Sequence, residues 1–478
     1  MKHLKTSSIL IGIVGSAVVT MSSTYVALRL GALPWPTVFA ALFSMFLLKP
    51  FRASLHDINV AHTAVSAGGL VAGGLVFTIP AVWILGKEIS PLWIFLSAAF
   101  GAIVGVRLTP STRNLYVEEF DLPFPMGVAA YETIKAGDEG GRKAKILFSS
   151  MGASAIFTYL RDGLGFIPVV YKGFGMFPMA VGIGFMIGIL PTMSWLAGGI
   201  IQMIFQHSWI RDLGLGMMIG GGIGLALKGW KKRIGFGRDE IWMAIFAFIF
   251  FAPMFGILPA IIASVLLVLV VHVAAVVDGT TGIDPMEVFA IVVVLATAAL
   301  WRGDEVWILA SLAAVVAVAT GLAGDSLQDM KTGKLLGTDP KAQLIAEAIG
   351  AAVGVLVGSA LLIAVHSKYG SSAFGSTFPV PQAMAVSKFL GGGSLSAPTI
   401  AGVLIGAILQ ILRLPALTFG IGLYLPLFIT LPVALGGVIR ILVEKLFRRD
   451  VQDWIVASSG LLGGEGVVGI IVGLIKPV

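Results

Sequence analysis

The sequence predicts an all-α polytopic membrane protein with about 14 to 16 transmembrane or re-entrant helices in two duplicated halves with broken helices. Of the 478 residues, 57% are hydrophobic and only 12% are charged, which lies far outside the range of a soluble globular chain. The mean hydropathy is +0.97. Long runs such as 261–277 and 291–300 are continuously apolar, whereas the strands of a transmembrane barrel would alternate with a period of two.

Apolar runs give the predicted spans in chain order. The first run, 9–28, follows Lys2 and Lys5 and continues without a convincing Ala-x-Ala cleavage site, so we interpret it as a membrane span and not as a signal peptide. A span needs about 20 residues, which leaves room for on the order of 14 crossing or re-entrant segments. Further apolar runs are 60–85, 243–277, 306–322 and 455–475.

Two Pro-x-Pro elements interrupt the apolar runs. Residues 122–125 read Leu-Pro-Phe-Pro and residues 378–381 read Phe-Pro-Val-Pro, and each opens a segment of roughly ten residues, too short to cross a bilayer. Proline lacks the backbone donor and fixes φ, so such breaks survive in lipid only where protein or a water-filled cavity satisfies the freed carbonyls. Broken helices at corresponding positions of two halves are typical of the binding site of a membrane carrier.

Collinear matches along the chain indicate a duplication, with residues 1–235 as the first half and 236–478 as the second. Similar composition of glycine- and valine-rich helices is the alternative explanation. The most basic loop, 228–240, would then connect the halves on the cytoplasmic side. Charge leaves open whether the halves are parallel or inverted.

The matches keep the same order in both halves, and the two Pro-x-Pro elements lie in register with them. Residues 182–201 align without a gap to 420–439 and are identical at seven of twenty positions. One of the identities joins Thr192 to Thr430. The shorter matches join 38–40 to 288–290 and 101–106 to 350–355.

Glu465 is the strongest single candidate for chemistry. It lies within an apolar run, with ten residues between it and the next ionisable group, Lys476. A carboxylate at membrane depth is costly and rare, and for that reason indicates function. We predict that Glu465 is the proton-coupling residue or binds a substrate ammonium group. The alternative is a helix-end glutamate at the level of the lipid headgroups.

Other candidates flank the Pro-x-Pro elements. A half-helix beginning near Pro125 would direct its positive end towards a substrate carboxylate. The alternatives are an ordinary solvated loop for 113–121 and a surface pair of Glu132 with Lys135, three residues apart. Glu118 and Glu119 are also second candidates for the coupling site. The predicted substrate-binding residues are Tyr131, Glu132, Gln382, Glu118 and Glu119.

Three further features are weaker candidates. The segment 324–334 is rich in groups that can bond a peptide or a chelate, although its Asp and Lys residues would equally suit a soluble loop. Asp278 ends the apolar run 261–277. His272 lies within that run, where a lone histidine is more often a satisfied packing residue than a ligand.

Several chemistries lack their residues in this sequence. Without any cysteine, the chain has no disulfide, thiolate nucleophile or Cys-ligated metal. The Walker A spacing of ATP-hydrolysing proteins and the His-Glu-x-x-His motif of zinc proteases are missing. Residues 322–325 lack the first glycine of the Gly-x-Gly-Asp pattern of intramembrane aspartyl proteases. The net charge of +7 is modest and fits cytoplasmic loops better than nucleic-acid binding. We expect no enzyme activity, no cofactor, no metal site and no nucleic-acid partner.

Five motifs resemble those of the oligopeptide transporter family, and they extend over nearly the whole chain. The first reads Asn-Val-Ala-His-Thr-Ala-Val-Ser-Ala-Gly at 59–68 and is followed by Phe-Thr-Ile-Pro. The resemblance implies duplicated helical halves and transport of small peptides or, in the yellow stripe-like branch, of metal chelates, usually driven by protons. The Asn-Pro-Gly and Lys-Ile-Pro-Pro-Arg signatures of the fungal and plant peptide branch are absent. The other motifs lie at 117–125, 328–333, 422–426 and 459–465.

From the sequence and this resemblance we expect a prokaryotic, multi-pass protein of the cell (cytoplasmic) membrane that imports small peptides by proton-coupled secondary transport. A carrier of metal chelates, siderophore-like or nicotianamine-like, is the alternative within the family. A channel and then an intramembrane hydrolase follow as rivals from other classes. The expected partners are small peptides or metal chelates, protons and the lipid bilayer, and a homo-oligomer stays open.

Overall fold

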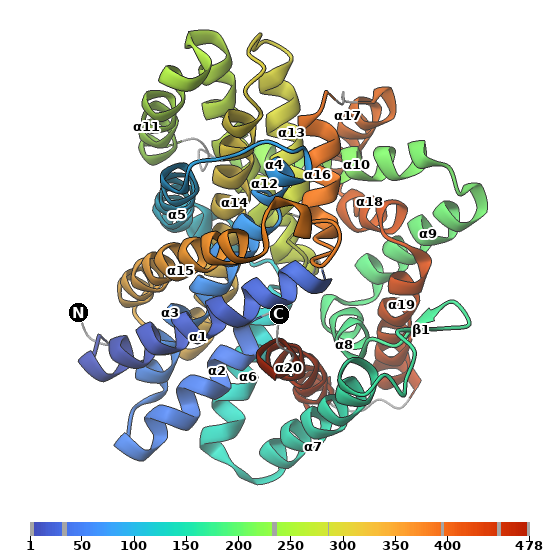
Figure 1. Cartoon of the computed structure of the whole chain (residues 1–478). Helices are drawn as coiled ribbons and strands as arrows, with labels where there is room; N and C mark the ends of the chain where they lie inside the picture. The colour runs from blue at the N-terminus through green and yellow to red at the C-terminus, as the bar shows by residue number, and fades with distance from the viewer. Residues whose placement is uncertain are drawn as a thin grey trace.

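The computed structural model describes residues 4–30, 36–231, 237–284, 286–392, 396–446 and 451–475. Within these ranges the chain is almost entirely helical, and Figure 1 shows the helices packed together as one bundle. The named strands form one short hairpin, β1 (Val170–Tyr171) and β2 (Phe174–Gly175). The predicted all-α class is therefore confirmed.

The first part of the chain forms ten α-helices among the described residues, with short turns of 3₁₀-helix at Lys49–Phe51 and of π-helix at Asn114–Glu119 and Tyr159–Gly163. The α-helices are α1 (Thr6–Leu30), α2 (Pro36–Leu48), α3 (Leu55–Val76), α4 (Pro80–Ile84), α5 (Pro91–Arg113), α6 (Pro125–Glu139), α7 (Gly141–Thr158), α8 (Pro178–Ile187), α9 (Ile189–Phe205) and α10 (Ser208–Lys231).

The second part is built in the same manner, with a 3₁₀ turn at Ser371–Ala373 and a π-helical turn at Leu442–Leu446. Its α-helices are α11 (Arg238–Phe255), α12 (Ile257–Thr281), α13 (Met286–Ala298), α14 (Val306–Leu336), α15 (Pro340–Tyr369), α16 (Pro381–Leu390), α17 (Ala397–Ile411), α18 (Ala416–Tyr424), α19 (Leu427–Ile441) and α20 (Val451–Ile475).

Seven helical stretches among the described residues are long and apolar enough to cross a membrane. Shorter apolar helices such as α8, α9 and α13 accompany them. The chain is therefore a multi-pass membrane protein, as the sequence predicted. The seven long stretches are Thr6–Thr24, Leu55–Ile84, Pro91–Glu119, Ile257–Thr281, Val306–Leu336, Pro340–Tyr369 and Leu427–Lys445.

Helices α3 and α14 form the buried centre of the protein. Ser66 of α3 contacts Asp329 of α14, whereas Gly74 lies against Val318, so the two helices run antiparallel. Small residues allow this close approach: a Cβ at Gly74 would lie 2.7 Å from the backbone nitrogen of Val318. The pair is covered by α15, which packs along α3, and by α5, which packs along α14.

Each Pro-x-Pro element opens a short helix, as predicted. Phe124 and Val380, the residues between the prolines, both have left-handed backbones, with φ of 44° and 35°. The Phe124 N–H donates to the carbonyl of Gly279 near the end of α12, at 2.8 Å. The Val380 N–H donates to the carbonyl of Leu28 near the end of α1, at 3.2 Å. Protein carbonyls thus fix both breaks in equivalent ways.

The pair α8–α9 crosses the pair α18–α19 through reciprocal contacts. Each pair is a broken helix, interrupted at Gly188 in the first and at Pro426 in the second. A Cβ at Gly199 would meet the side chain of Thr430, and a Cβ at Gly437 would meet that of Thr192. These are the residues that the sequence comparison of the halves had matched.

The division into two halves stays a prediction. Its boundary between residues 235 and 236 lies outside the described residues, as does the central part, 232–236, of the basic loop 228–240.

Candidate functional site

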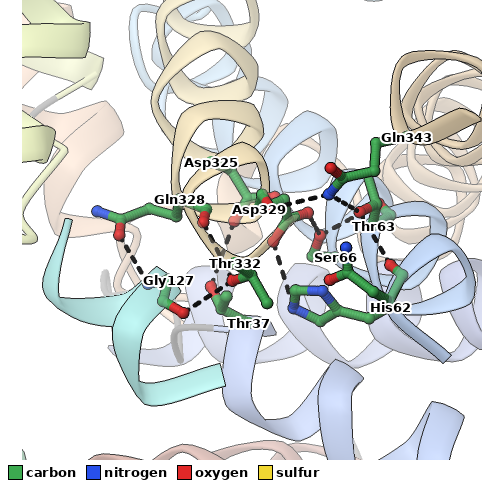
Figure 2. Close-up of polar contacts among 11 residues, drawn as sticks. Thr37, His62, Thr63, Ser66, Gly127, Asp325, Gln328, Asp329, Thr332 and Gln343 are labelled. Carbon is green, nitrogen blue, oxygen red and sulfur yellow. Dashed lines mark hydrogen bonds and ion pairs between the residues drawn. The ribbon is translucent and has the colours of Figure 1, made fainter. Parts of the chain in front are cut away.

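A cluster of buried polar side chains lies where α2, α3, α14 and α15 meet. Figure 2 shows side chains from α3, α14 and α15 directed towards one another. We call the three acids Asp325, Asp329 and Glu347 the core carboxylate cluster. All three are buried, with at most 4% of their surface exposed. The polar residues buried around them are Thr37, Asn59, His62, Thr63, Ser66, Ser326 and Gln343.

Helical spacing explains why these side chains share a face. Each of the three long helices contributes a pair four residues apart, His62 with Ser66, Asp325 with Asp329, and Gln343 with Glu347. Their registers are fixed at the helix starts. Helix α3 begins with a capping box between Ser54 and Asp57. Helix α15 begins with Asp339 as N-cap, followed by Pro340.

Asp329 is the most extensively bonded member of the cluster. The Ser66 hydroxyl donates to its Oδ2 at 2.6 Å, and His62 Nε2 lies 3.2 Å from its Oδ1. The Gln343 amide donates to the main-chain carbonyl of Asp329 at 2.8 Å and to the Thr63 hydroxyl at 3.2 Å. Asp329 therefore connects α3 to α14, and Gln343 extends the network to α15.

Asp325 and Glu347 have fewer partners. The Thr37 hydroxyl lies 3.4 Å from Asp325 Oδ1, and neither carboxylate oxygen of Glu347 has a hydrogen bond of normal geometry to a described residue. Among the described residues no lysine or arginine forms an ion pair with any of the three acids, and His62 is the only basic group in contact. Burial in an apolar environment disfavours such an excess of negative charge. The cluster is suited to binding protons or a cationic group.

Gln328 connects α14 to the first Pro-x-Pro element. Its Oε1 accepts the N–H of Gly127 in the first turn of α6 at 2.8 Å, and its Nε2 donates to Asp278 Oδ2 at 2.9 Å. The Thr332 hydroxyl donates to the carbonyl of Gly127 at 2.8 Å. Figure 2 shows α6 held against α14 by these contacts. The break before Pro125 is therefore anchored to α14, the helix that also carries Asp325 and Asp329.

Two lysines of α14 bind the segment that leads into this break. Lys331 Nζ lies 2.8 Å from Asp121 Oδ1, and Lys334 Nζ lies 2.9 Å from the same oxygen. Asp121 lies beyond the end of the α5 span, and its side chain is 65% exposed. Hydrogen bonds from Lys331 and then Lys334 hold the pKa of Asp121 below its ordinary value.

The predicted substrate residues on α6 contact other groups than expected. Glu132 is buried and accepts a hydrogen bond from Gln452 of α20 at 2.6 Å. Lys135 Nζ donates to the Tyr131 hydroxyl at 2.8 Å and lies 3.8 Å from Glu139. The surface pair of Glu132 with Lys135 is therefore not the main contact of either residue.

The segment 113–121 is not an ordinary loop, because residues 114–119 continue α5 as a π-helical turn. Glu118 pairs with Arg113 at 2.6 Å and lies 3.5 Å from Lys334. Glu119 follows it at the end of the turn, and Gln382 lies in the first turn of α16. The structure brings Glu118 near the first Pro-x-Pro element, whereas Gln382 belongs to the second.

Glu465 lies in the interior of α20 and not at a helix end. Its Oε1 pairs with Arg161 at 2.8 Å, and its Oε2 accepts the N–H of Met179 at the start of α8 at 2.7 Å. Arg161 also binds Asp162 and the carbonyl of Met176. Glu465 therefore joins α20 to the π-helical turn after α7 and to α8. The role of Glu465 in proton coupling stays a prediction.

The three weaker candidates have different surroundings in the structure. The segment 324–334 lies within α14 and is almost wholly buried, so it is not a soluble loop. Asp278 is fully buried and contacts Gln328. His272 Nδ1 lies 3.1 Å from the Tyr116 hydroxyl, and its Nε2 lies 3.6 Å from Oε1 of the buried Glu240, so this histidine contacts an acid as well as a packing partner.

Four residues of the network were absent from the predicted site, namely His62, Asp325, Asp329 and Glu347. A signal for them was present, because each is ionisable and lies in or beside an apolar run, and three of them lie in segments that had been singled out.

Comparison with known proteins gives matches over nearly the full length. The sequence model of the family described as OPT oligopeptide transporter protein matches residues 5–227 and 240–476. A protein of Haemophilus influenzae with the provisional name of oligopeptide transporter is 25% identical, over 94% of this chain and 92% of its own length. A protein of Saccharomyces cerevisiae with the same provisional name is 30% identical, over 31% of this chain and 24% of its own length.

Proposed function

Because the chain belongs to the OPT oligopeptide transporter family, we propose that it is a proton-coupled secondary transporter that imports small peptides across the cytoplasmic membrane. Membership of the family makes it a multi-pass membrane transporter and not an enzyme. The proposal adds the proton as driving ion, the peptide as substrate and the cytoplasmic membrane as location.

The core carboxylate cluster is the observation that carries this proposal. Three buried acids lie together with a single imidazole, that of His62 beside Asp329, and no described lysine or arginine forms an ion pair with them. A proton is the smallest group that can restore neutrality, and Asp329 has the hydroxyl of Ser66 and the imidazole of His62 in place to organise it. We assign proton binding to Asp329 together with Asp325 and Glu347.

Protonation at this place acts on the contact between the predicted halves. Helix α3 belongs to the first half, and α14 and α15 belong to the second. Charged acids repel one another and draw in water, whereas neutral acids allow the three helices to pack closely. Binding of a proton would therefore bias the arrangement of one half against the other.

The arrangement of α3 and α14 favours inverted halves. Both helices lie between matched segments, so they are equivalent under the duplication, and they run antiparallel. Two antiparallel helices related by a two-fold axis require that axis to be perpendicular to them, and thus in the plane of the membrane. Carriers with such repeats expose a central site to each side in turn by exchanging the conformations of the halves.

Substrate contacts are proposed near the starts of α6 and α16. Tyr131 and Glu132 lie in the second turn of α6, after the first break, and Gln382 lies in the first turn of α16, after the second break. Glu118 and Glu119 would contribute from the π-helical turn that precedes the first break. Their side chains bring both charge and hydrogen-bonding groups to the breaks, which suits a substrate with two different ends.

Glu465 stays a second candidate for coupling. Its carboxylate could accept a proton only by separating from Arg161, which lies 2.8 Å away.

Uptake into proteoliposomes tests the proposal. Labelled di- to hexapeptides and iron chelates are supplied with and without an inward proton gradient, to the wild type and to Asp329→Asn, Glu465→Gln and Asp304→Asn. Asp304 is an exposed acid outside the helices and serves as the matched control. We expect saturable peptide uptake that follows the gradient in the wild type and in Asp304→Asn. Asp329→Asn should lose the gradient dependence while retaining exchange of labelled for unlabelled peptide.

Four results would contradict parts of the proposal. Uptake of chelates without uptake of peptides would assign the chain to the chelate branch. Full gradient-driven uptake by Asp329→Asn would show that the core carboxylate cluster does not couple transport to protons. Loss of gradient-driven uptake in Glu465→Gln alone would assign that role to Glu465. Conduction without saturation would indicate a channel.

A further inference from the structure

A second group of acids lies on another face of α14, next to the first Pro-x-Pro element. Asp278 is in the last turn of α12 and is fully buried, and Asp284 lies in the turn between α12 and α13. Both carboxylates face Gly324 of α14. A Cβ at Gly324 would lie 3.2 Å from Asp278 Oδ2 and 3.2 Å from Asp284 Oδ2, so the two groups converge on the space that a larger residue would fill.

Three oxygens of this pair lack hydrogen-bond partners among the described residues. They are Oδ1 of Asp278 and both carboxylate oxygens of Asp284. The remaining oxygen, Oδ2 of Asp278, accepts the Gln328 amide at 2.9 Å. No described lysine, arginine or histidine forms an ion pair with either acid. Glu287, at the start of α13, adds a further negative charge nearby.

The pair adjoins the first Pro-x-Pro element directly. A Cβ at Gly282, between the two acids in sequence, would lie 2.8 Å from the ring of Pro125, and one at Gly279 would lie 2.7 Å from the ring of Phe124. The break before α6 and the two acids therefore form neighbouring walls of one region. This is the region in which the proposed function places the substrate.

We propose that Asp278 and Asp284 form a binding site for an ammonium group of the substrate. An alkylammonium group carries three N–H donors and no acceptor, which matches the three unpartnered oxygens. Its positive charge offsets the two carboxylates, and the missing side chain of Gly324 leaves room for it. A metal ion fits less well, because the described residues contain no group of three or more acids or histidines arranged to hold one.

This inference rests on the proposed function, because it names the chemical group by which the transporter would recognise its substrate. It assigns the acids of the two faces of α14 to different tasks. Asp325 and Asp329 face α3 and His62 and bind protons, whereas Asp278 and Asp284 face the α12–α13 turn and bind substrate. Gln328 lies between the two groups and contacts Asp278.

Two sources could supply the ammonium group, the amino terminus of a peptide or a lysine side chain. Competition against a labelled tripeptide distinguishes them. The unlabelled competitors are triglycine, N-acetyl-triglycine and N-acetyl-Gly-Lys-Gly, used with the wild type, Asp284→Asn, Gly324→Ala and the control Asp304→Asn. A charge-assisted contact of this kind is worth about 10- to 100-fold in affinity.

We expect acetylation of triglycine to weaken competition at least about tenfold in the wild type and in Asp304→Asn. Asp284→Asn and Gly324→Ala should reduce this preference to about twofold or less, whereas the control Asp304→Asn should keep uptake that follows the proton gradient. Recovery of affinity by N-acetyl-Gly-Lys-Gly would show that a side-chain ammonium also satisfies the site. If the lysine does not restore affinity, the site is specific for the amino terminus.

Equal competition by triglycine and its acetylated form in the wild type would overturn the inference, as would an unchanged preference in both variants. Binding of the tripeptide to purified protein, measured without a gradient, separates this failure from that of the proposed function. If the purified wild type does not bind the tripeptide, the proposal of peptide transport itself is contradicted. Peptide binding without an amine preference would contradict only the ammonium site.

Discussion

Replacing Gln328 by methionine should loosen the first turn of α6. The glutamine accepts the N–H of Gly127 at 2.8 Å and donates to Asp278 Oδ2 at 2.9 Å. Gly127 is buried, and its N–H belongs to the first turn of the helix, which has no intrahelical acceptor. Methionine keeps the approximate volume of glutamine and removes both hydrogen bonds.

The structure sets the size of the expected effect. An unsatisfied buried donor costs about 1–3 kcal/mol. Two contacts that continue to hold the turn remain in the variant, from the Phe124 N–H to Gly279 and from the Thr332 hydroxyl to the Gly127 carbonyl. We therefore expect the lower part of the range, about 1–2 kcal/mol, which corresponds to roughly a 5- to 30-fold increase in local opening.

Hydrogen exchange measured by mass spectrometry on the purified protein reports this opening, through the peptide that covers the start of α6. A second variant, Gln328→Glu, keeps the acceptor for Gly127, and because burial beside Asp278 favours its neutral form, its O–H can replace the amide donor to Asp278 Oδ2. Exchange at α6 should rise 5- to 30-fold in Gln328→Met and stay near the wild-type rate in Gln328→Glu. Unchanged exchange in the methionine variant would refute the reasoning, and an equal rise in both would show that the acceptor for Gly127 is not what holds the turn.

Three further predictions concern the stability of the fold. Asp121→Asn should lower the melting temperature at neutral pH, because it removes the carboxylate that pairs with the lysines of α14. The difference from wild type should vanish as the pH falls below about 4 and through the lowered pKa of Asp121, since the wild-type carboxylate is then protonated. A difference that persists at low pH would contradict this reasoning. Gly184→Ala should cost about 1–3 kcal/mol because its Cβ would overlap a carbonyl of α19, whereas Gly152→Ala, with open space around it, should be neutral or stabilising in the same melting assay. Arg161→Met should lower the free energy of unfolding by about 3 kcal/mol, because it removes the cation that pairs with the Glu465 carboxylate. Adding Glu465→Gln to this variant should recover part of the loss. If stability does not recover, the arginine acts through its other contacts.

The breaks of the fold could be predicted from local chemistry. Two prolines two residues apart remove two backbone donors and strongly disfavour a continuous helix, and the structure begins α6 and α16 at the second proline of each element. The matched segments 182–201 and 420–439 likewise cross through paired glycines and threonines. The breaks depend on the backbone of each segment itself, which is why the sequence reveals them, whereas the crossing is a contact between distant segments that the alignment alone did not predict.

The core carboxylate cluster depends on which helices become neighbours. Spacing shows that Asp325 and Asp329 share a face of α14, but no local rule says that this face meets His62 on α3 and Glu347 on α15. Glu465, which lies alone in its run, is easier to recognise from sequence. Its partner Arg161 is separated from it by about 300 residues of sequence and could not be identified in that way.

The acids of the centre are distributed unequally along the two equivalent helices. At one end of the antiparallel pair, Asp329 meets Ser66 and His62, whereas at the other end Gly74 meets Val318 and neither 67–86 nor 306–324 contains an ionisable residue. An exact duplication would have placed a carboxylate cluster at both ends. If the halves are inverted, the two ends lie towards opposite faces of the membrane, and the proposed proton site would belong to one face only. On this proposal, the matched contacts at the two Pro-x-Pro breaks would allow the transporter two similar conformations, one open to each side of the membrane. Because only one end of the α3–α14 pair carries acids, the two conformations would differ in proton affinity.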